Sequence, residues 1–262
     1  MCNRVARKMS ARMIREYFPY LLEHDNLQYD IGPMDHVQGV GVFASHPILY
    51  IPRDETEIHL QLIKWEIIEH FRKVKPDMKN RNFMLNARSE RILNDPKVYW
   101  NKIQDKRCLI PVTGTYEHRG IQGWKKKVPY FIKPCDQTVF FLPGLYSRAE
   151  LADVQTGEVI PTYTFSMITR AANEVMRNIH NDGENRWRMP LFLPLEMSKE
   201  FLSKDLSKER YAEILAYEMP SEDLQYFPVA TIATAKLRED GLDKDAPYEW
   251  AKLPALGELN PM

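Results

Sequence analysis

Apolar and polar residues follow helical spacing in a few stretches of the chain and strand-like spacing in many others. Residues 10–23 carry apolar side chains along one helical stripe, which predicts a helix whose second half is weakened by Pro19. Shorter helices are predicted over 171–179 and over 207–217, the latter capped by Ser207. Asp95 and Pro96 are typical of a helix start.

Strands are predicted where short apolar or alternating runs lie between Gly, Pro and polar residues. These runs are residues 39–43, 48–51, 58–62, 108–112, 116–118, 129–133, 138–142, 162–168 and 191–193. The runs 129–133 and 138–142 are expected to form a pair joined at 134–137. Many short strands with few helices and no long linker predict one α+β domain with a mainly antiparallel sheet.

Composition narrows the classes of function. Hydrophobic residues make up 44% of the 262 positions, enough for a buried core. No apolar run reaches the length of about 18 residues that a membrane helix needs, and the first residues lack the apolar segment of a secretion signal. Cys2, Cys108 and Cys135 show no paired spacing, so we expect no disulfide, metal site or cofactor, no membrane partner, and a cytoplasmic location, nucleoid-associated if the source is bacterial.

The net charge is zero, yet the charge is unevenly distributed. Residues 1–15 carry +5, residues 64–133 carry +10, and residues 196–262 carry −6. The two basic segments are consistent either with a solvated mixed surface or with a positive groove for a phosphate backbone. In the second case the groove is electropositive and the acidic region lies elsewhere.

Cys2 is the first candidate for chemistry. Initiator Met is normally removed before a small residue such as Cys, which leaves a free α-amine beside a thiol. Both groups are partly in their reactive forms near neutral pH. Such an aminothiol condenses with an aldehyde: the amine forms an imine, and the sulfur then adds to the imine carbon to close a thiazolidine. The alternative is an inert, frayed terminus.

Three further motifs each admit a chemical and a structural interpretation. The run Leu85-Asn86-Ala87-Arg88-Ser89-Glu90 is either an anion-binding segment or a loop with a surface ion pair. Glu117, after the apolar strand that contains Cys108, is a general acid–base or an exposed strand end, whereas Cys108 is expected to be a buried apolar residue. His180 is an acid–base or a structural histidine.

Taken in order, these motifs resemble the SRAP family, whose name stands for SOS response-associated peptidase. The resemblance rests on Met-Cys-x-Arg at the start, a strand with Trp65, Asn-Ala-Arg-Ser-Glu at 86–90, Arg-Cys-Leu-Ile-Pro-x-x-Gly-x-Tyr-Glu at 107–117, Thr-x-x-Ala-Asn at 169–173, and His180 before Arg-Met-Pro at 188–190. It implies a single SRAP-like α+β domain over residues 1–262, with core motifs in 2–190, a curved, barrel-like antiparallel sheet, a few flanking helices, and the acidic region 196–262 within or packed on the domain.

The resemblance also implies a function. A member of this family senses abasic sites in single-stranded DNA and bonds to the ring-opened sugar through the mature N-terminal Cys, giving a thiazolidine crosslink that protects the lesion. Autocatalytic removal of residues before Cys2 is linked to the same chemistry. No cofactor is implied, the partner is single-stranded DNA with abasic sites, and a monomer is expected.

Individual roles carry over onto matching positions. Cys2 supplies the amine and thiol, Asn86 positions the reacting groups, and Glu117 orients the amine and moves protons. His180 assists opening and closing of the sugar and reversal of the crosslink. Four residues are assigned to DNA: Arg4, Arg88 and Arg188 on phosphates, and Trp65, which either stacks near the DNA or packs in the core.

The sequence departs from the family pattern at four places. Asn3 and Glu66 replace the usual Gly, and His118 replaces the usual Trp. Seven residues, 181–187, separate His180 from Arg188, which is more than the family commonly has, and Arg186 is an alternative to Arg188. Two other hypotheses remain beside the abasic-site sensor: a cysteine amidase or protease that uses Cys2 with His180 and Glu117, and a non-catalytic single-strand binding module.

Overall fold

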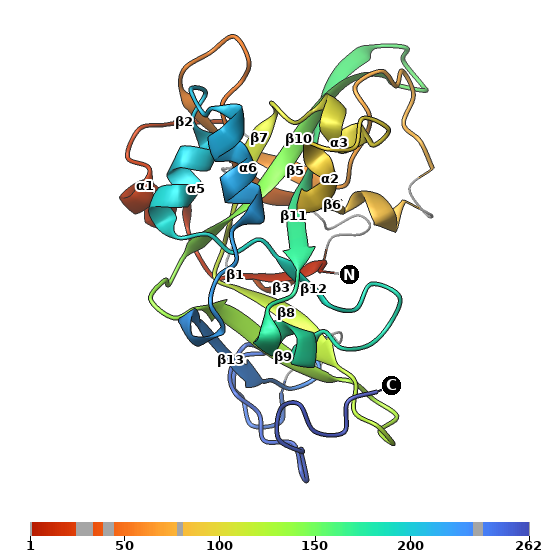
Figure 1. Ribbon diagram of the computed structural model, residues 1–262. Coiled ribbons are helices and arrows are strands. Elements are labelled where there is room, and N and C mark those ends of the chain that lie inside the picture. Colours follow the sequence, from red (N-terminus) through yellow and green to blue (C-terminus); the bar gives the residue numbers. More distant parts are fainter. Residues whose placement is uncertain (1, 25–33, 39–44, 78–80, 233–237, 262) are drawn as a thin grey trace.

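The computed structural model describes residues 2–24, 34–38, 45–77, 81–232 and 238–261, and it confirms an α+β domain (Figure 1). Short helices lie beside two sheets that are mainly antiparallel. The helices are α1 (Ala11–Tyr17), α2 (Ser89–Ile92), α3 (Tyr99–Lys102), α4 (Glu174–Ile179), α5 (Leu195–Leu202) and α6 (Lys208–Ala216), with single 3-10 turns η2 (Asn82–Met84) and η3 (Ser221–Asp223). None of the helices described has the length and apolarity needed to cross a bilayer.

The smaller sheet has five strands in the order β13-β9-β8-β1-β3. They are β13 (Leu224–Pro228), β9 (Val128–Pro134), β8 (Gly114–Arg119), β1 (Arg4–Arg7) and β3 (Met34–Gln38). Every pairing in it is antiparallel, and β1 lies between β8 and β3. The start of the chain is therefore an inner strand of this sheet.

The larger sheet curves until it closes. Its order is β12-β11-β10-β7-β4-β5-β2, and β6 pairs with β11 beside this path. The strands are β12 (Arg188–Pro190), β11 (Val159–Ala171), β10 (Phe140–Ala152), β7 (Arg107–Val112), β4 (Ser45–Tyr50), β5 (Ile58–Trp65), β2 (Leu21–Glu23) and β6 (Asn86–Arg88). Because β5 also pairs with β11, in parallel, the path from β11 through β10, β7 and β4 to β5 returns to its first strand. The expected curved, barrel-like sheet is confirmed.

Both faces of this sheet are buried, which explains why the sequences of its central strands are continuous apolar runs. In β7, Cys108 and Ile110 belong to one core cluster. Leu109, which points to the opposite face, belongs to a second cluster that also contains Ile14 of α1 and Phe201 of α5. Figure 1 shows the closed sheet with α1, α2, α3, α5 and α6 in the upper part, and the five-stranded sheet below, with the start of the chain between them.

The predicted helices form, but three have different limits, since α4 begins at Glu174 and Ala171 is the last residue of β11. Ser10 caps α1 by accepting from the amide of Met13, and the helix ends at Tyr17 instead of continuing to residue 23, because Pro19 cannot extend it. Residues beyond Pro19 form β2, which pairs with β5. Asp95 accepts from the amide of Lys97 in a turn, and α3 begins only at Tyr99. The caps Asn173 and Ser207 start α4 and α6.

Two strand predictions are wrong. The runs 129–133 and 138–142 are strands, but β9 pairs with β8 and β13, whereas β10 pairs with β7 and β11. They belong to different sheets because the chain changes sheet between them. Residues 191–193 are not a strand; the strand is β12, just before them. The predicted run 39–43 lies outside the described residues, and α5 and β13 were not predicted.

The C-terminal segment packs on the five-stranded sheet. Arg119 of β8 is fully buried and donates to the carbonyls of Pro254 at 2.9 Å, Ala255 at 2.6 Å and Glu258 at 2.8 Å. Lys8 is ion-paired with Asp243 and Asp245 at 2.7 and 2.6 Å. Part of the acidic excess of residues 196–262 is therefore used to hold this segment on the domain.

Replacing Arg119 tests the contribution of these contacts. We expect Arg119→Ala to lower the free energy of unfolding by about 2–4 kcal/mol, since it leaves buried carbonyls without a donor and creates a cavity. Denaturant unfolding measures the change. Arg148→Ala is the matched control, because Arg148 is 44% exposed and paired with Glu150 at the surface, so its loss should cost less than about 1 kcal/mol. Equal losses for the two variants would contradict this account.

Candidate active site

Cys2 lies where the two sheets meet, immediately before β1. The register pairs Val5 with Thr115 and Ala6 with Gly114, so the residues before β1 run alongside the half of β8 that carries Glu117. Gly114 permits this packing, because a Cβ there would lie 2.0 Å from the ring of Phe131. Cys2 is 3% exposed and belongs to the same core cluster as the inner side chains of β7.

Cys2, Glu117 and His180 come together although they are far apart in the sequence. Their Sγ, carboxylate and imidazole donor atoms all lie within 4.8 Å of one another, and all three residues are buried. His180 is the C-cap of α4, and its Nε2 is 3.8 Å from Oε2 of Glu117. Its Nδ1 is 2.8 Å from the carbonyl of Arg188. Since a carbonyl oxygen only accepts, Nδ1 carries a proton and Nε2 faces the carboxylate.

Burial shifts the pKa of Cys2 and the pKa of His118, which lies beside the cluster. Burial, followed by the nearby charge of Glu117, raises the pKa of the Cys2 thiol well above its ordinary value. Burial also lowers the pKa of the neighbouring His118 to about 4, against the opposing effect of Glu117. At neutral pH the resting site therefore holds a thiol and an uncharged His118.

A hollow of about 440 Å³ opens beside Cys2. Its walls are Cys2, Phe83, Met84, Asn86, Arg88, Arg91, Val98, Tyr99, Trp100, Thr169, Asn185 and Arg188. Asn86, on β6, lies there with both amide atoms buried and without a hydrogen-bond partner among the described residues. Because buried polar groups are normally satisfied, this amide points to a ligand that would complete it.

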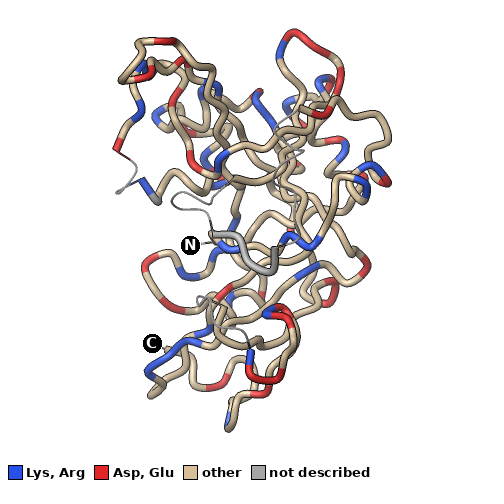
Figure 2. Tube along the Cα trace, turned by 180° about the vertical axis from the view of Figure 1, so that it is seen from behind, with Lys and Arg blue, Asp and Glu red and all other residues tan. Residues whose placement is uncertain are grey.

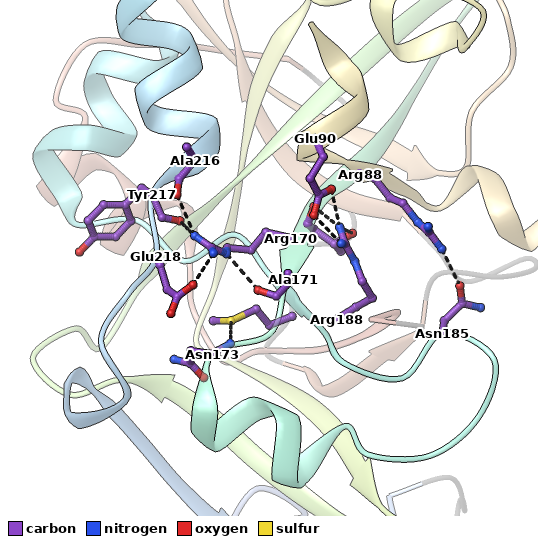
Figure 3. Close-up of polar contacts among 12 residues, drawn as sticks. Arg88, Glu90, Arg170, Ala171, Asn173, Asn185, Arg188, Ala216, Tyr217 and Glu218 are labelled. Atoms are coloured by element: carbon purple, nitrogen blue, oxygen red, sulfur yellow. Dashed lines mark hydrogen bonds and ion pairs between the residues drawn. The ribbon is translucent and has the colours of Figure 1, made fainter. Parts of the chain in front are cut away.

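Among the described residues, the walls of this hollow contain three arginines and no Asp or Glu, as the predicted positive groove requires. Two of these arginines are neutralised at the rim. Arg188 is bound to Glu90 at 2.6 and 3.0 Å (Figure 3), and Arg91 pairs with Asp95. Arg88 instead donates to the uncharged amide oxygen of Asn185 at 3.3 Å. Arg88 is therefore better placed than Arg188 to take a phosphate.

A second hollow, also of about 440 Å³, lies on the other side of the cluster. It is lined by Arg4, Glu117, His118, Lys127, His180, Asp182, Gly183, Glu184 and Asn185. Its charge is mixed, since Asp182 pairs with Lys127 at 2.9 Å. Four of the seven residues 181–187 line it, and Asn185 lines both hollows, so this segment lies between them.

None of the residues described within 196–262 lines either hollow, which agrees with the expectation that the acidic region lies elsewhere. Figure 2 nevertheless shows basic and acidic positions interleaved at both ends of the molecule. Glu218, for example, pairs with Arg170 on the far side of β11 from Arg88 (Figure 3). Charges of both signs are thus distributed over the molecule, and the described lining of the hollow beside Cys2 is unusual in holding arginines without Asp or Glu.

The structure does not support a DNA contact by Trp65. The ring is 1% exposed, stacks on Phe165 with ring centroids 5.7 Å apart, and donates to the carbonyl of Leu85. Of the two roles considered for it, packing is the one observed. Arg186 does not replace Arg188 in the wall; its guanidinium lies 4.5 Å from the centre of the Trp187 ring.

Sequence reasoning missed several residues of the hollow beside Cys2. Phe83 is 63% exposed at its wall, and Tyr99 and Arg91 lie opposite. An apolar side chain that interrupts a basic segment, as Phe83 does, was an available signal for single-strand binding. Arg91 could have been found because it lies three residues after Arg88, which had been assigned to DNA, and residues three apart share one face of a helix. Asn185 had no signal, because it lies between His180 and Arg188 and outside the motifs that were recognised.

The fold and the site define a protein with an N-terminal thiol held beside a carboxylate and an imidazole. The family model described as "SOS response associated peptidase (SRAP)" matches residues 1–234, and the chain belongs to this family.

Named relatives and a solved structure agree with this assignment. "Abasic site processing protein YoqW" of Bacillus subtilis (strain 168) is 28% identical over 218 residues, which cover 83% of this chain and 90% of that protein. "Abasic site processing protein HMCES" of Gallus gallus is 24% identical over 95% of this chain and 78% of its own length. A crystal structure of a protein from Bacteroides thetaiotaomicron superposes with a TM-score of 0.71 at 26% identity, covering 94% of this chain and 97% of that one.

Alkylation tests the electrostatics of Cys2. In a Cys135→Ser background, we expect the rate of Cys2 alkylation to rise with pH well above about 8.5, the usual thiol range, because the folded-state pKa is raised. Adding Glu117→Gln removes a negative charge and should move the profile to lower pH. Mass spectrometry of the modified peptides separates Cys2 from the buried Cys108. An unmoved profile would show that Glu117 does not act on the thiol.

Proposed function

We propose that this protein recognises abasic sites in single-stranded DNA and becomes covalently joined to them through Cys2. The observation that carries the proposal is the buried cluster of Cys2, Glu117 and His180 between two hollows, with the unpartnered amide of Asn86 beside it. The names of the relatives support the same substrate.

The proposed reaction is a condensation. After removal of Met1, the α-amine of Cys2 attacks C1′ of the ring-opened sugar aldehyde, and the carbinolamine that forms loses water to give an imine. The sulfur then adds to the imine carbon while its proton moves to the nitrogen. Aldehyde and aminothiol thus become a thiazolidine and one water, and no oxidant or reductant is needed.

The cluster supplies the proton transfers. Glu117, whose carboxylate lies within 4.8 Å of the Cys2 Sγ, is assigned to take a proton from the α-ammonium of the same residue, because the amine must be neutral to attack. His180, whose Nδ1–H is held by the carbonyl of Arg188, presents Nε2 for moving a proton to the departing hydroxyl. A protonated resting thiol suits this order of steps, because the amine must attack first and the sulfur second.

Recognition of a single strand fits the walls of the hollow beside Cys2. An abasic site offers no base edge, so binding depends on the aldehyde, the phosphates and stacking of neighbouring bases. Arg88 supplies positive charge, and the exposed ring of Phe83 supplies a surface for stacking. Arg4, at the second hollow, is assigned to a phosphate on the other side of the lesion.

An amidase or peptidase is the second candidate, because the family name contains "peptidase" and a thiol, an imidazole and a carboxylate also serve acyl transfer. The two functions differ in turnover. Crosslinking is stoichiometric with DNA, whereas hydrolysis releases the protein after each cycle.

The decisive experiment is a denaturing gel after incubation with single-stranded DNA that contains one abasic site. We expect a heat-resistant shifted band from protein whose intact mass lacks Met1, and loss of the band in Cys2→Ser. Glu117→Gln and His180→Ala should each slow its formation by about 10²–10⁴-fold, the usual contribution of a general acid–base.

Cys135→Ser is the matched control, since this exposed thiol is remote from the hollows and should leave the yield unchanged. Absence of a band from correctly processed protein would refute the proposal. Repeated turnover of a peptide that depends on Cys2 would favour the amidase instead.

Binding without chemistry tests Arg88. With a tetrahydrofuran analogue, which has no aldehyde, Arg88→Ala should weaken binding and reduce the slope of log affinity against log salt by about 0.7, the value for one single-strand phosphate. Arg148 lines neither hollow, so the control variant Arg148→Ala should leave the slope unchanged. The same slope for Arg88→Ala and the parent protein would place the phosphates elsewhere.

A further inference from the structure

Cys2, Glu117 and His180 have the composition of a metal site as well as of a proton relay. Among the described residues, they are the one group of three His, Cys, Asp or Glu residues whose donor atoms lie close enough together to share an ion. Thiolate, imidazole and carboxylate are the three ligand types that Zn²⁺ uses in proteins.

The distances are close to those of a tetrahedral site. Ligands at about 2.0–2.3 Å from a tetrahedral ion lie roughly 3.3–3.8 Å from one another. His180 Nε2 and Glu117 Oε2 are already 3.8 Å apart, and the donor atoms of the cluster span no more than 4.8 Å. A shift of about 1 Å, within reach of side-chain rotation, would complete the geometry.

The orientation of His180 also fits a ligand. A metal-bound histidine usually donates its other ring N–H to a carbonyl or carboxylate, which fixes the tautomer. His180 donates Nδ1–H to the carbonyl of Arg188 at 2.8 Å, which leaves the lone pair of Nε2 directed into the cluster. By contrast, the buried His46 uses Nε2 for the carbonyl of Pro111 and lies outside any such group.

Charge favours an ion at this place. A Cys2 thiolate beside the Glu117 carboxylate would be a buried pair of like charges, which is unfavourable without a cation between them. A divalent cation would balance both negative charges and displace the thiol proton. The α-amine of a processed Cys2 would add a fourth ligand and close a five-membered chelate ring with its own sulfur.

We propose that Cys2, Glu117 and His180 form a Zn²⁺ site, and that bound zinc blocks the reaction with aldehydes. On binding, Zn²⁺ replaces the proton of the Cys2 thiol, so that a zinc thiolate forms and one proton is released. Zinc and the aldehyde need the same sulfur and nitrogen, so they exclude one another. The metal site stands on the side chains alone, whereas its inhibitory effect rests on the proposed crosslinking function.

Cobalt is the probe, because Co²⁺ occupies zinc sites and a thiolate–cobalt bond gives a charge-transfer absorption. We expect the full-length Cys135→Ser protein to bind one Co²⁺ with this absorption and with the visible bands of a tetrahedral ion, and Zn²⁺ to abolish both. Cys2→Ser should remove the charge-transfer absorption. His180→Ala and Glu117→Gln should weaken binding at least about tenfold.

His70→Gln is the matched control, since His70 is exposed, remote from the cluster and bound to Tyr99. Circular dichroism of each variant shows that it is folded. Absence of the charge-transfer absorption, or its persistence in Cys2→Ser, would overturn the metal site.

A second arm tests competition. Protein loaded with one equivalent of Zn²⁺ should crosslink abasic DNA at least about tenfold more slowly than metal-free protein, and a chelator should restore the rate, as expected when ligand and substrate share one site. Equal rates would overturn the inhibition. A protein that binds cobalt through Cys2 but never crosslinks would refute the proposed function and leave the metal site standing.

Discussion

Burial of Cys2 beside Glu117 is the constraint on which the rest of this structure depends. A thiol and a carboxylate removed from water together disfavour ionisation of the thiol, so its protonation is controlled by its neighbours rather than by solvent. Placing the start of the chain there requires β1 to be an inner strand, with β8 on one side and β3 on the other. Gly114 pairs with Ala6 of β1, and only a residue without a Cβ fits there beside the ring of Phe131.

The closed sheet supplies the other half of the site. β11 pairs with β6 along one edge and with β12 along the other, which brings Asn86 and the carbonyl of Arg188 to the same end of this strand. That carbonyl fixes the tautomer of His180, and the side chain of Arg188 is fixed in turn by Glu90. Arg188 is thus a residue that positions its neighbours, and Arg88 is the cation left for a ligand.

The sequence predicts which residues gather at the site better than it predicts the topology. Cys2, Asn86, Glu117 and His180 could be selected because their motifs occur in a recognisable order, and Ser10 and Ser207 could be recognised because capping is local. The pairing of β9 could not be predicted, since an apolar run does not specify which of two sheets it joins. Trp65 and Arg119 were equally unpredictable, because burial of a side chain depends on segments distant in sequence.

The contacts of Arg119 have a consequence for synthesis of the chain. The strand that carries Glu117 is completed only by carbonyls 135, 136 and 139 residues further along. Cys2 leaves the ribosome first, yet β8, the strand that its segment runs beside, receives these contacts only after residue 258 has been made. Contacts of such long range form slowly. The strand that carries Glu117 therefore gains its last hydrogen bonds at the end of synthesis, long after the thiol that it will adjoin has been made.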